Sequence, residues 1–276
     1  MFQIYLVSVA LPYGLLVATS NLLTASRMEI ERLDAIGYPR NFLKQVIFRL
    51  DFPPILAIHN PPDRFQADLR HDFPLLRKEV TEIKIGERSV EERVVWMFVS
   101  LDEKKVISVS PDYVGVDFNG CYSTFEEYRE LVERVLGGFV EAYDRISLIN
   151  RIGLRYINEI TLPNGSALEW EGLINPALLG HLSFRPEGTR YARIMSQAIE
   201  KTEEYDLSLT YGLPNNREFP GEIVRRMFLL DIDCYRKGVE TEPDVLETLD
   251  GFHHAIQGLF EESIEQGLRD ILEQGG

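Results

Sequence analysis

The chain has 276 residues, 45% of them hydrophobic, so it can bury a core without help from metals or disulfides. Its formal net charge is -15, which repels a phosphate backbone, and since no basic stripe offsets this charge we do not expect nucleic-acid binding. The two cysteines, Cys121 and Cys234, lie far apart, which argues against a disulfide scaffold or a structural zinc site.

Residues 1–27 differ from the rest of the chain because Arg27 is their one charged side chain. Their apolar stretch, residues 2–18, is marginal for a membrane span, which needs about twenty apolar residues. It also lacks the basic segment that opens a signal peptide. We favour a third interpretation, in which residues 1–27 are a mis-assigned start or a disordered head and Met28 begins a cytoplasmic protein that does not associate with membranes.

The first half of the chain shows strand periodicity at residues 44–52 and a short helical pattern that begins at Asp63 and breaks near Pro74. Turn signals then separate four strand candidates, at residues 80–87, 93–101, 105–111 and 113–119. The sequence from Ser123 to Glu126 is a capping box, which predicts the start of a long helix there. One stripe of that helix is apolar and predicts its buried face: Phe125, Tyr128, Val132, Val135, Phe139 and Tyr143.

The second half repeats this order. It begins with a long strand candidate at residues 147–162, followed by a helical segment at residues 166–179 that breaks at Pro176. Four further strands are predicted at residues 181–187, 190–201, 205–213 and 224–236. An amphipathic helix then runs from Pro243, which suits the first helical position because that position needs no backbone N–H.

The predicted fold class is therefore α+β, with two tandem β-α-β4-α halves at residues 28–145 and 146–276. In each half an antiparallel sheet packs on a long helix, as in TATA-binding-protein-like and helix-grip folds. The halves are expected to associate either as one continuous saddle or as two sheets with a cleft between them. Element order alone carries no function.

No motif predicts a catalytic, cofactor or metal site. The histidines stand outside every hydrolase or metalloprotease pattern: His59, His71, His181, His253 and His254. Adjacent helical side chains diverge by about 100°, so His253 and His254 cannot bind one metal together and are interpreted as helix surface or core edge. The pair Gly137 and Gly138 interrupts the first long helix and is interpreted as close packing or a bend.

Two acidic residues, Asp231 and Asp233, alternate with apolar residues and so share one face of their strand. A pair of carboxylates on one face could act as a paired acid or hold a cation. More often, such a pair is the solvated face of a half-exposed strand, and we favour that interpretation.

The most specific segment is RIGLRYINEI, at residues 151–160. Alternation places Arg151 and Arg155 on one face with Gly153 between them, and Tyr156 and Asn158 on the other. The two arginines are suited to bind a carboxylate or phosphate in a bidentate manner. Alternatively, they pair with acidic residues of neighbouring strands or of their own, and the excess of acids in this chain favours such structural pairing.

Three segments resemble a sporadically distributed bacterial family without an assigned activity: YPRNFLKQVIFRLDFPP, DRISLINRIGLRYINEI and HHAIQGLFEESIEQGLRDIL. The resemblance covers about residues 38–272, with RIGLRYINEI as its sharpest motif. It implies a bacterial cytosolic setting and a start at Met28, because residues 1–27 fall outside it. A patchy distribution would suit a gene on mobile or defence-related loci, and the resemblance adds no catalytic residue.

We therefore expect a non-catalytic binding or interaction protein without a cofactor, whose partner is another protein or a second copy in a homodimer. The candidate ligand- or partner-binding residues are Arg151, Arg155, Tyr156 and Asn158. The alternative is a small-molecule-binding or hydrolytic domain whose site lies between sheet and long helix and uses Arg155, Tyr156 or Asn158. Nucleic-acid binding by a saddle-shaped sheet would require a basic concave face.

Overall fold

The structure is a computed structural model that describes residues 37–59, 63–85, 89–143, 146, 148–182, 184, 190–215, 221–240 and 244–274. Residues Pro39–Gly276 form one compact unit, and only residues 37 and 38 of the preceding unit, Met1–Tyr38, are described. The predicted apolar head at residues 1–27 lies outside the described residues.

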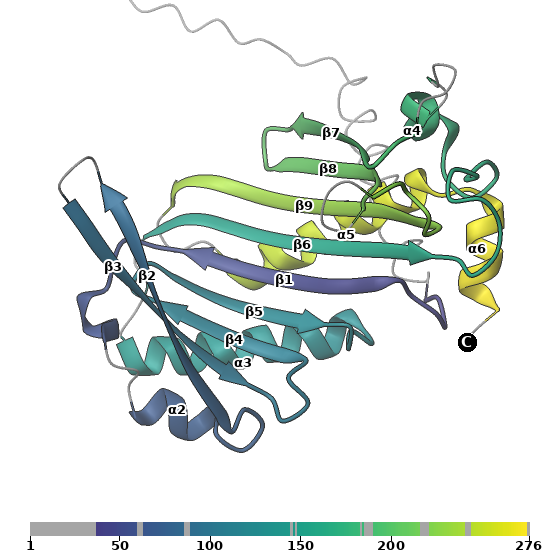
Figure 1. The fold of residues 1–276 in the computed structure, drawn as a ribbon. Coiled ribbons are helices and arrows are strands. Elements are labelled where there is room, and N and C mark those ends of the chain that lie inside the picture. The colour runs from purple at the N-terminus through teal and green to yellow at the C-terminus, as the bar shows by residue number, and fades with distance from the viewer. Residues whose placement is uncertain are drawn as a thin grey trace, which may run out of the picture. The chain divides into compact units, whose positions relative to one another are not determined.

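The described part of the chain is an α+β fold built on a single nine-stranded sheet (Figure 1). The strands are β1 (Leu43–Asp51), β2 (Leu75–Ile85), β3 (Ser89–Val99), β4 (Lys105–Ser110), β5 (Tyr113–Asn119), β6 (Ile149–Thr161), β7 (Ile194–Lys201), β8 (Asp206–Leu213) and β9 (Met227–Glu240). The helical segments are η1 (Leu56–His59), α2 (Asp63–Leu69), α3 (Phe125–Tyr143), α4 (Pro176–Leu179), η2 (Gly180–Leu182), α5 (Val245–Ser263) and α6 (Gln266–Glu273).

The strand order across the sheet is β2-β3-β4-β5-β1-β6-β9-β8-β7, and all neighbouring strands are antiparallel. The leading strands of the two expected halves, β1 and β6, pair at the centre, with Phe48 opposite Leu154. The strands of both expected halves thus join in one sheet. Of the two predicted arrangements, the continuous sheet is the one observed.

The two long helices, α3 and α5, lie on the same side of the sheet (Figure 1). Alternate residues of the central strands point to these helices and are buried, among them Phe48, Leu154 and Ile232. On the helix side, Tyr128 of α3 packs edge-on against Phe118 at 4.9 Å, and its hydroxyl donates to the carbonyl oxygen of Val116 at 2.9 Å. We call the opposite side, which no helix of the described residues covers, the open face.

The two long helices begin one or more residues later than the sequence predicts. The N-terminus of α3 is capped by Thr124, whose hydroxyl accepts from the backbone N–H of Glu127, so the cap lies one residue after the predicted Ser123. In α5 the cap is Asp244, whose carboxylate accepts from the N–H groups of Leu246 and Glu247. The predicted helix start at Pro243 was therefore wrong, because the stronger capping residue follows it.

The second half differs from the predicted order in the segment between β6 and β7. Only Pro176–Leu179 is α-helical in the predicted helix at residues 166–179. In the predicted strand at residues 181–187, His181 and Leu182 belong to the 3-10 helix η2, Phe184 is not in a strand, and the other residues lie outside the described part. Three strands, not four, therefore follow β6 in the described residues, and β7 forms that edge of the sheet.

The β2–β3 hairpin reaches beyond the rest of the sheet as a two-stranded arm (Figure 1). β3 pairs with β2 along its whole length, but it pairs with β4 only from Trp96 to Val99. The ammonium group of Lys78 lies 5.1 Å from the centre of the Trp96 ring at the base of the arm.

Candidate functional site

The four predicted site residues on β6 divide between the two sides of the sheet, as the alternation of the strand predicted. Arg151 and Arg155 lie on the open face, where their side chains pair with residues of β9. Tyr156 and Asn158 are buried on the helix side. A single site cannot hold all four side chains, because the sheet separates them.

Arg155 is held by Asp231 of β9. Its Nε donates to Asp231 Oδ1 at 2.7 Å and its Nη2 to Oδ2 at 2.5 Å, which is the bidentate geometry that best suits a guanidinium and a carboxylate. The hydrogen bond with Asp231 raises the pKa of the Arg155 guanidinium. The Arg155 side chain is nevertheless 43% exposed, whereas that of Asp231 is 11% exposed, so the arginine faces solvent over a fixed carboxylate.

Arg151 lies across Gly153 and reaches Asp233, with Nη2 3.3 Å from Asp233 Oδ2. A Cβ atom added at Gly153 would stand 2.6 Å from Arg151 Nη1, so the space left by this glycine is filled by the guanidinium. The same guanidinium lies 5.1 Å from the centre of the Tyr235 ring. Burial raises the pKa of the Asp233 carboxyl, and the charge of Arg151 opposes this shift.

A third arginine, Arg49 of β1, continues this pattern on the other side of the central strand pair. Its Nη2 lies 2.7 Å from Asp51 Oδ1, and its guanidinium lies over the ring of Tyr113 at 3.9 Å. Asp51 Oδ2 is also 3.9 Å from Arg151 Nη1, which joins the pairs of β1 to those of β6 and β9. We call this connected group the arginine–aspartate array: Arg49, Asp51, Arg151, Arg155, Asp231 and Asp233.

Asp117 of β5 lies near the array but has no basic partner among the residues that the structure describes. Its Oδ2 accepts from Gln45 Nε2 at 2.7 Å, while its Oδ1 is buried without a hydrogen bond to the described residues. Burial raises the pKa of the Asp117 carboxyl, and the hydrogen bonds from Gln45 and Asn119 only partly oppose this shift.

On the helix side, the Tyr156 hydroxyl connects α5 with the segment before α3. It lies 2.9 Å from His253 Nδ1 and 3.3 Å from the Tyr122 hydroxyl. The ring of His253 stacks on that of Phe125 at 3.8 Å, with an angle of 7° between the planes. Burial raises the pKa of Tyr122 to about 12 and places that of Tyr156 well above its ordinary value, so both phenols are neutral at physiological pH.

Asn158, 5% exposed, is part of the core. Its Nδ2 donates to the backbone carbonyl of Leu230 at 3.4 Å, which is a weak hydrogen bond. Two surface hollows lie along α3, and neither is lined by Tyr156, Asn158 or His253. Arg155 lies on the other face of the sheet. Of the residues predicted for a site between sheet and helix, Tyr156 therefore remains, with its hydrogen-bonded neighbours Tyr122 and His253.

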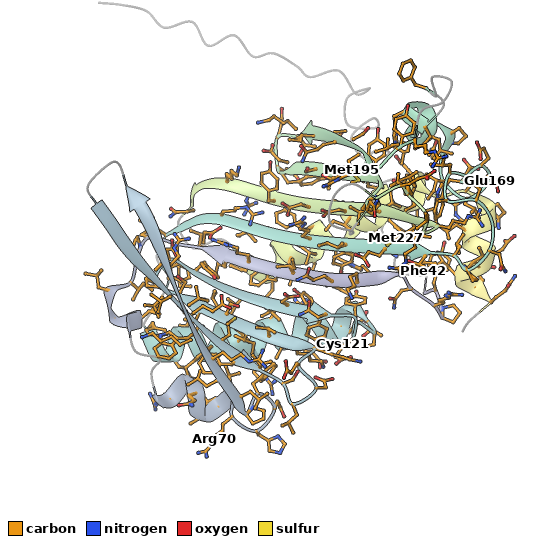
Figure 2. All side chains as sticks on the ribbon, in the orientation of Figure 1. Phe42, Arg70, Cys121, Glu169, Met195 and Met227 are labelled. Atoms are coloured by element: carbon orange, nitrogen blue, oxygen red, sulfur yellow. The ribbon has the colours of Figure 1, made fainter. Side chains whose placement is uncertain are left out.

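The remaining candidate groups are structural in the described residues. Cys234 is buried on the helix side with a raised pKa, while Cys121 follows β5 (Figure 2), and both are free thiols. The described residues contain no group of three or more His, Cys, Asp or Glu side chains placed to hold a metal ion. Asp231 and Asp233 share one face, as predicted, but each contacts an arginine instead of acting as a free acid pair.

Sequence reasoning missed the contribution of β1 to the array. Alternation in KQVIFRLDF already placed Arg49 and Asp51 on one face, so the signal was present. The role of His253 had no comparable signal, because it depends on the packing of α5 against α3 and β6.

No protein-family model matches the chain, and no curated protein is similar to it. The resemblance to a bacterial family therefore stays a prediction. None of the helices in the described part of the chain has the length and apolar character that a membrane span requires.

Proposed function

We propose that this chain is a non-catalytic binding protein of the bacterial cytosol, and that its open face recognises another protein. The arginine–aspartate array is the observation that supports this proposal. Arginine and tyrosine are enriched among the side chains that dominate binding energy in protein interfaces. The array presents Arg49 over Tyr113 and Arg151 over Tyr235. Their strands, β1, β5, β6 and β9, lie at the middle of the sheet (Figure 1), where a partner would meet a preorganised surface.

The charges on the open face favour a protein over a nucleic acid. On the four central strands, β5, β1, β6 and β9, the carboxylates of this face are Asp51, Asp117, Glu159, Asp231 and Asp233. The basic groups of this face on the same strands are Arg49, Arg151, Arg155 and Lys237. On these central strands carboxylates outnumber basic groups by five to four, and all three arginines already contact a carboxylate, so a phosphate backbone would meet net repulsion.

We further infer that the two halves arose by duplication, in the manner of TATA-binding-protein-like and helix-grip folds. The strand order supports this inference, because β5, β4 and β3 follow β1 on one side as β9, β8 and β7 follow β6 on the other. The central register agrees with it. Phe48 faces Leu154, and each is followed by an arginine of the array, Arg49 or Arg155.

The alternative function is a small-molecule-binding or hydrolytic domain with a site on the helix side. The hydrogen-bonded group of Tyr122, Tyr156 and His253 is the observation that favours it. Turnover of a substrate from a broad hydrolase panel, lost on Tyr156→Phe, would establish this alternative and contradict a non-catalytic role. We expect no turnover by the wild-type protein.

The binding proposal is tested by exchanging the members of one ion pair. In the double variant Arg155→Asp with Asp231→Arg, the pair can still form while its charges trade places. We expect near wild-type unfolding but loss of the partner that the wild-type protein captures from the native host. Arg193→Glu, a charge reversal at an exposed residue outside the array, should retain that partner. Capture by the exchanged variant at wild-type level would contradict the role of the open face.

The cellular setting of the gene follows from the resemblance alone, and we propose a mobile or defence-related locus on that ground. Sequencing the neighbouring genes in several hosts tests it. Neighbours that are uniformly housekeeping genes would contradict it.

We also propose that the open face can bind a second copy of the chain and so form a homodimer. Light scattering, which measures the mass of the protein in solution, tests this.

A further inference from the structure

A second surface, separate from the open face, lies along one flank of α3. Two hollows there, of about 530 and 280 Å³, share Arg134 at their boundary. Arg134 Nη1 donates to Asp72 Oδ2 at 2.7 Å, so this ion pair stands between the hollows. Together they form a groove bounded by α2, by the β3–β4 turn and by a stripe of α3 that runs from Glu127 to Glu141.

The floor of the groove is apolar and well packed. Phe73 and Leu131 line the larger hollow, and Phe65 and Leu69 line the smaller one. These side chains are buried in the core, so the floor is fixed by the packing of α2 on α3 and on the sheet.

The walls of the groove carry acidic groups that the fold leaves without a partner. Glu130 lines the larger hollow, and Asp68 and Glu141 line the smaller one. All three are exposed, and none forms a hydrogen bond or ion pair with the described residues. By contrast, the two basic side chains of the groove, Lys105 and Arg134, are each paired with a carboxylate.

Gly137 is a further feature of the groove. It lies in the middle of α3, where glycine is less favourable than alanine by about 1 kcal/mol. At the neighbouring Gly138 an added Cβ would stand 3.5 Å from the ring of Phe65, which is ordinary van der Waals contact. At Gly137 an added Cβ would meet nothing within 4 Å, so the chain's own packing does not require a glycine there. Its absent side chain leaves the helix backbone accessible in the smaller hollow.

From these observations we propose that the α3 groove binds a basic segment of another protein, one that carries lysine or arginine together with apolar side chains. The apolar residues would contact the floor, and the basic groups would pair with Glu130, Asp68 and Glu141. The net charge of -15 would draw such a segment toward this chain. This surface is distinct from the open face, so the groove and the array are separable by mutation.

The test uses Gly137→Leu, which fills the groove while improving helix propensity. Peptides are selected from a random display library on the wild-type chain and counter-selected on this variant. We expect the surviving peptides to be basic and to contain apolar residues, with affinity at least tenfold weaker for Gly137→Leu and a melting temperature for that variant at or above that of the wild type. Loss of binding would then not be attributable to unfolding.

Two matched controls complete the design. Gly251→Leu makes the same change at an exposed position of α5 where an added Cβ also meets nothing, and it should leave peptide affinity unchanged. Glu130→Lys should weaken binding at least tenfold, whereas Glu262→Lys, at an exposed residue outside the groove, should not. The Arg155/Asp231 exchange should also leave peptide binding intact.

Three results would overturn the proposal. The selected peptides could be acidic or neutral, or none could discriminate wild type from Gly137→Leu. Alternatively, Gly137→Leu could convert a dimer to a monomer in light scattering, in which case the occupant is a second copy of the chain and not a basic partner segment.

Discussion

The arginines of the open face gain fixed positions from the carboxylates and rings beside them. Arg155 rests on Asp231 through two hydrogen bonds, and Arg151 is confined between Asp233 and the space above Gly153. The side chains of Arg49 and Arg155 are 40% and 43% exposed, and an exposed ion pair contributes little stability, about 0–1 kcal/mol. This small contribution fits the proposed role of these two arginines in recognition, for which fixed charges at half-exposed positions are useful.

Arg151 favours the charged form of Asp233, whose carboxylate is partly buried. Arg151→Ala should lower the free energy of unfolding by about 1–3 kcal/mol at pH 7, because a desolvated carboxylate loses its partner. Burial raises the pKa of Asp233, so protonation in acid removes the charge that needs pairing. The loss should shrink as the pH falls through that raised pKa. Urea unfolding at pH 7 and pH 4 measures this, and an equal loss at both values would contradict it.

Asp117 gives a prediction of the opposite kind, because ionisation of this partly buried carboxyl lowers the stability of the folded protein. Its pKa is raised in the folded protein, so the native state binds the proton more tightly than the unfolded chain. Stability from this group is complete below the ordinary pKa of aspartate and is lost as the pH rises through the raised pKa. Asp117→Asn should thus increase the melting temperature at pH 7 and have little effect at pH 3. A decrease at pH 7 would show that the charge is stabilising.

At the scale of elements, the start of α5 has a strong local determinant. Asp244 accepts two backbone hydrogen bonds, from Leu246 at 3.1 Å and Glu247 at 3.0 Å. The helix that it caps packs on β6 and β9 and places His253 within hydrogen-bonding distance of Tyr156.

Asp244→Ala should destabilise the protein by about 1 kcal/mol, the usual effect of removing an N-cap acceptor. Asp244→Ser should retain most of the stability, since serine also caps helices. Thermal unfolding followed by circular dichroism compares the three proteins. Equal losses in both variants would mean that the carboxylate acts through charge and not through capping.

Local periodicity predicted the elements whose two faces differ most. It located β1, β6, β9, α3 and α5 and placed Arg151 and Arg155 on one face. It could not identify Asp231 and Asp233 as their partners, because strand register across β6 and β9 depends on pairing between residues distant in the chain. The segment at residues 166–175 has helical spacing yet forms turns around the buried Trp170, where tertiary packing outweighs local propensity.

At the scale of the whole unit, the β1–β6 pair joins what the sequence suggested were two halves. The array crosses this pair, and on the other side of the sheet Arg129 of α3 forms a two-point ion pair with Asp250 of α5. Because the same sheet runs through both halves, we expect residues 39–276 to unfold as one cooperative unit.

The two tryptophans allow a direct check, because Trp96 lies in the first expected half and Trp170 in the second. The variants Trp96→Phe and Trp170→Phe each keep one fluorescent reporter. Each variant's fluorescence transition in urea should coincide with its own transition measured by circular dichroism. A fluorescence midpoint that departs from the circular dichroism midpoint of the same variant would mean that the halves unfold separately despite the shared sheet.

Photo-cross-linking in the native host can detect the proposed contact between the open face and another protein. A photoreactive amino acid replaces Ile157, which lies on the open face of β6 beside the array, or Glu262, which is exposed on α5. We expect a covalent adduct with another polypeptide from position 157 and none from position 262. Adducts from position 262 alone, or no adduct from position 157, would contradict it.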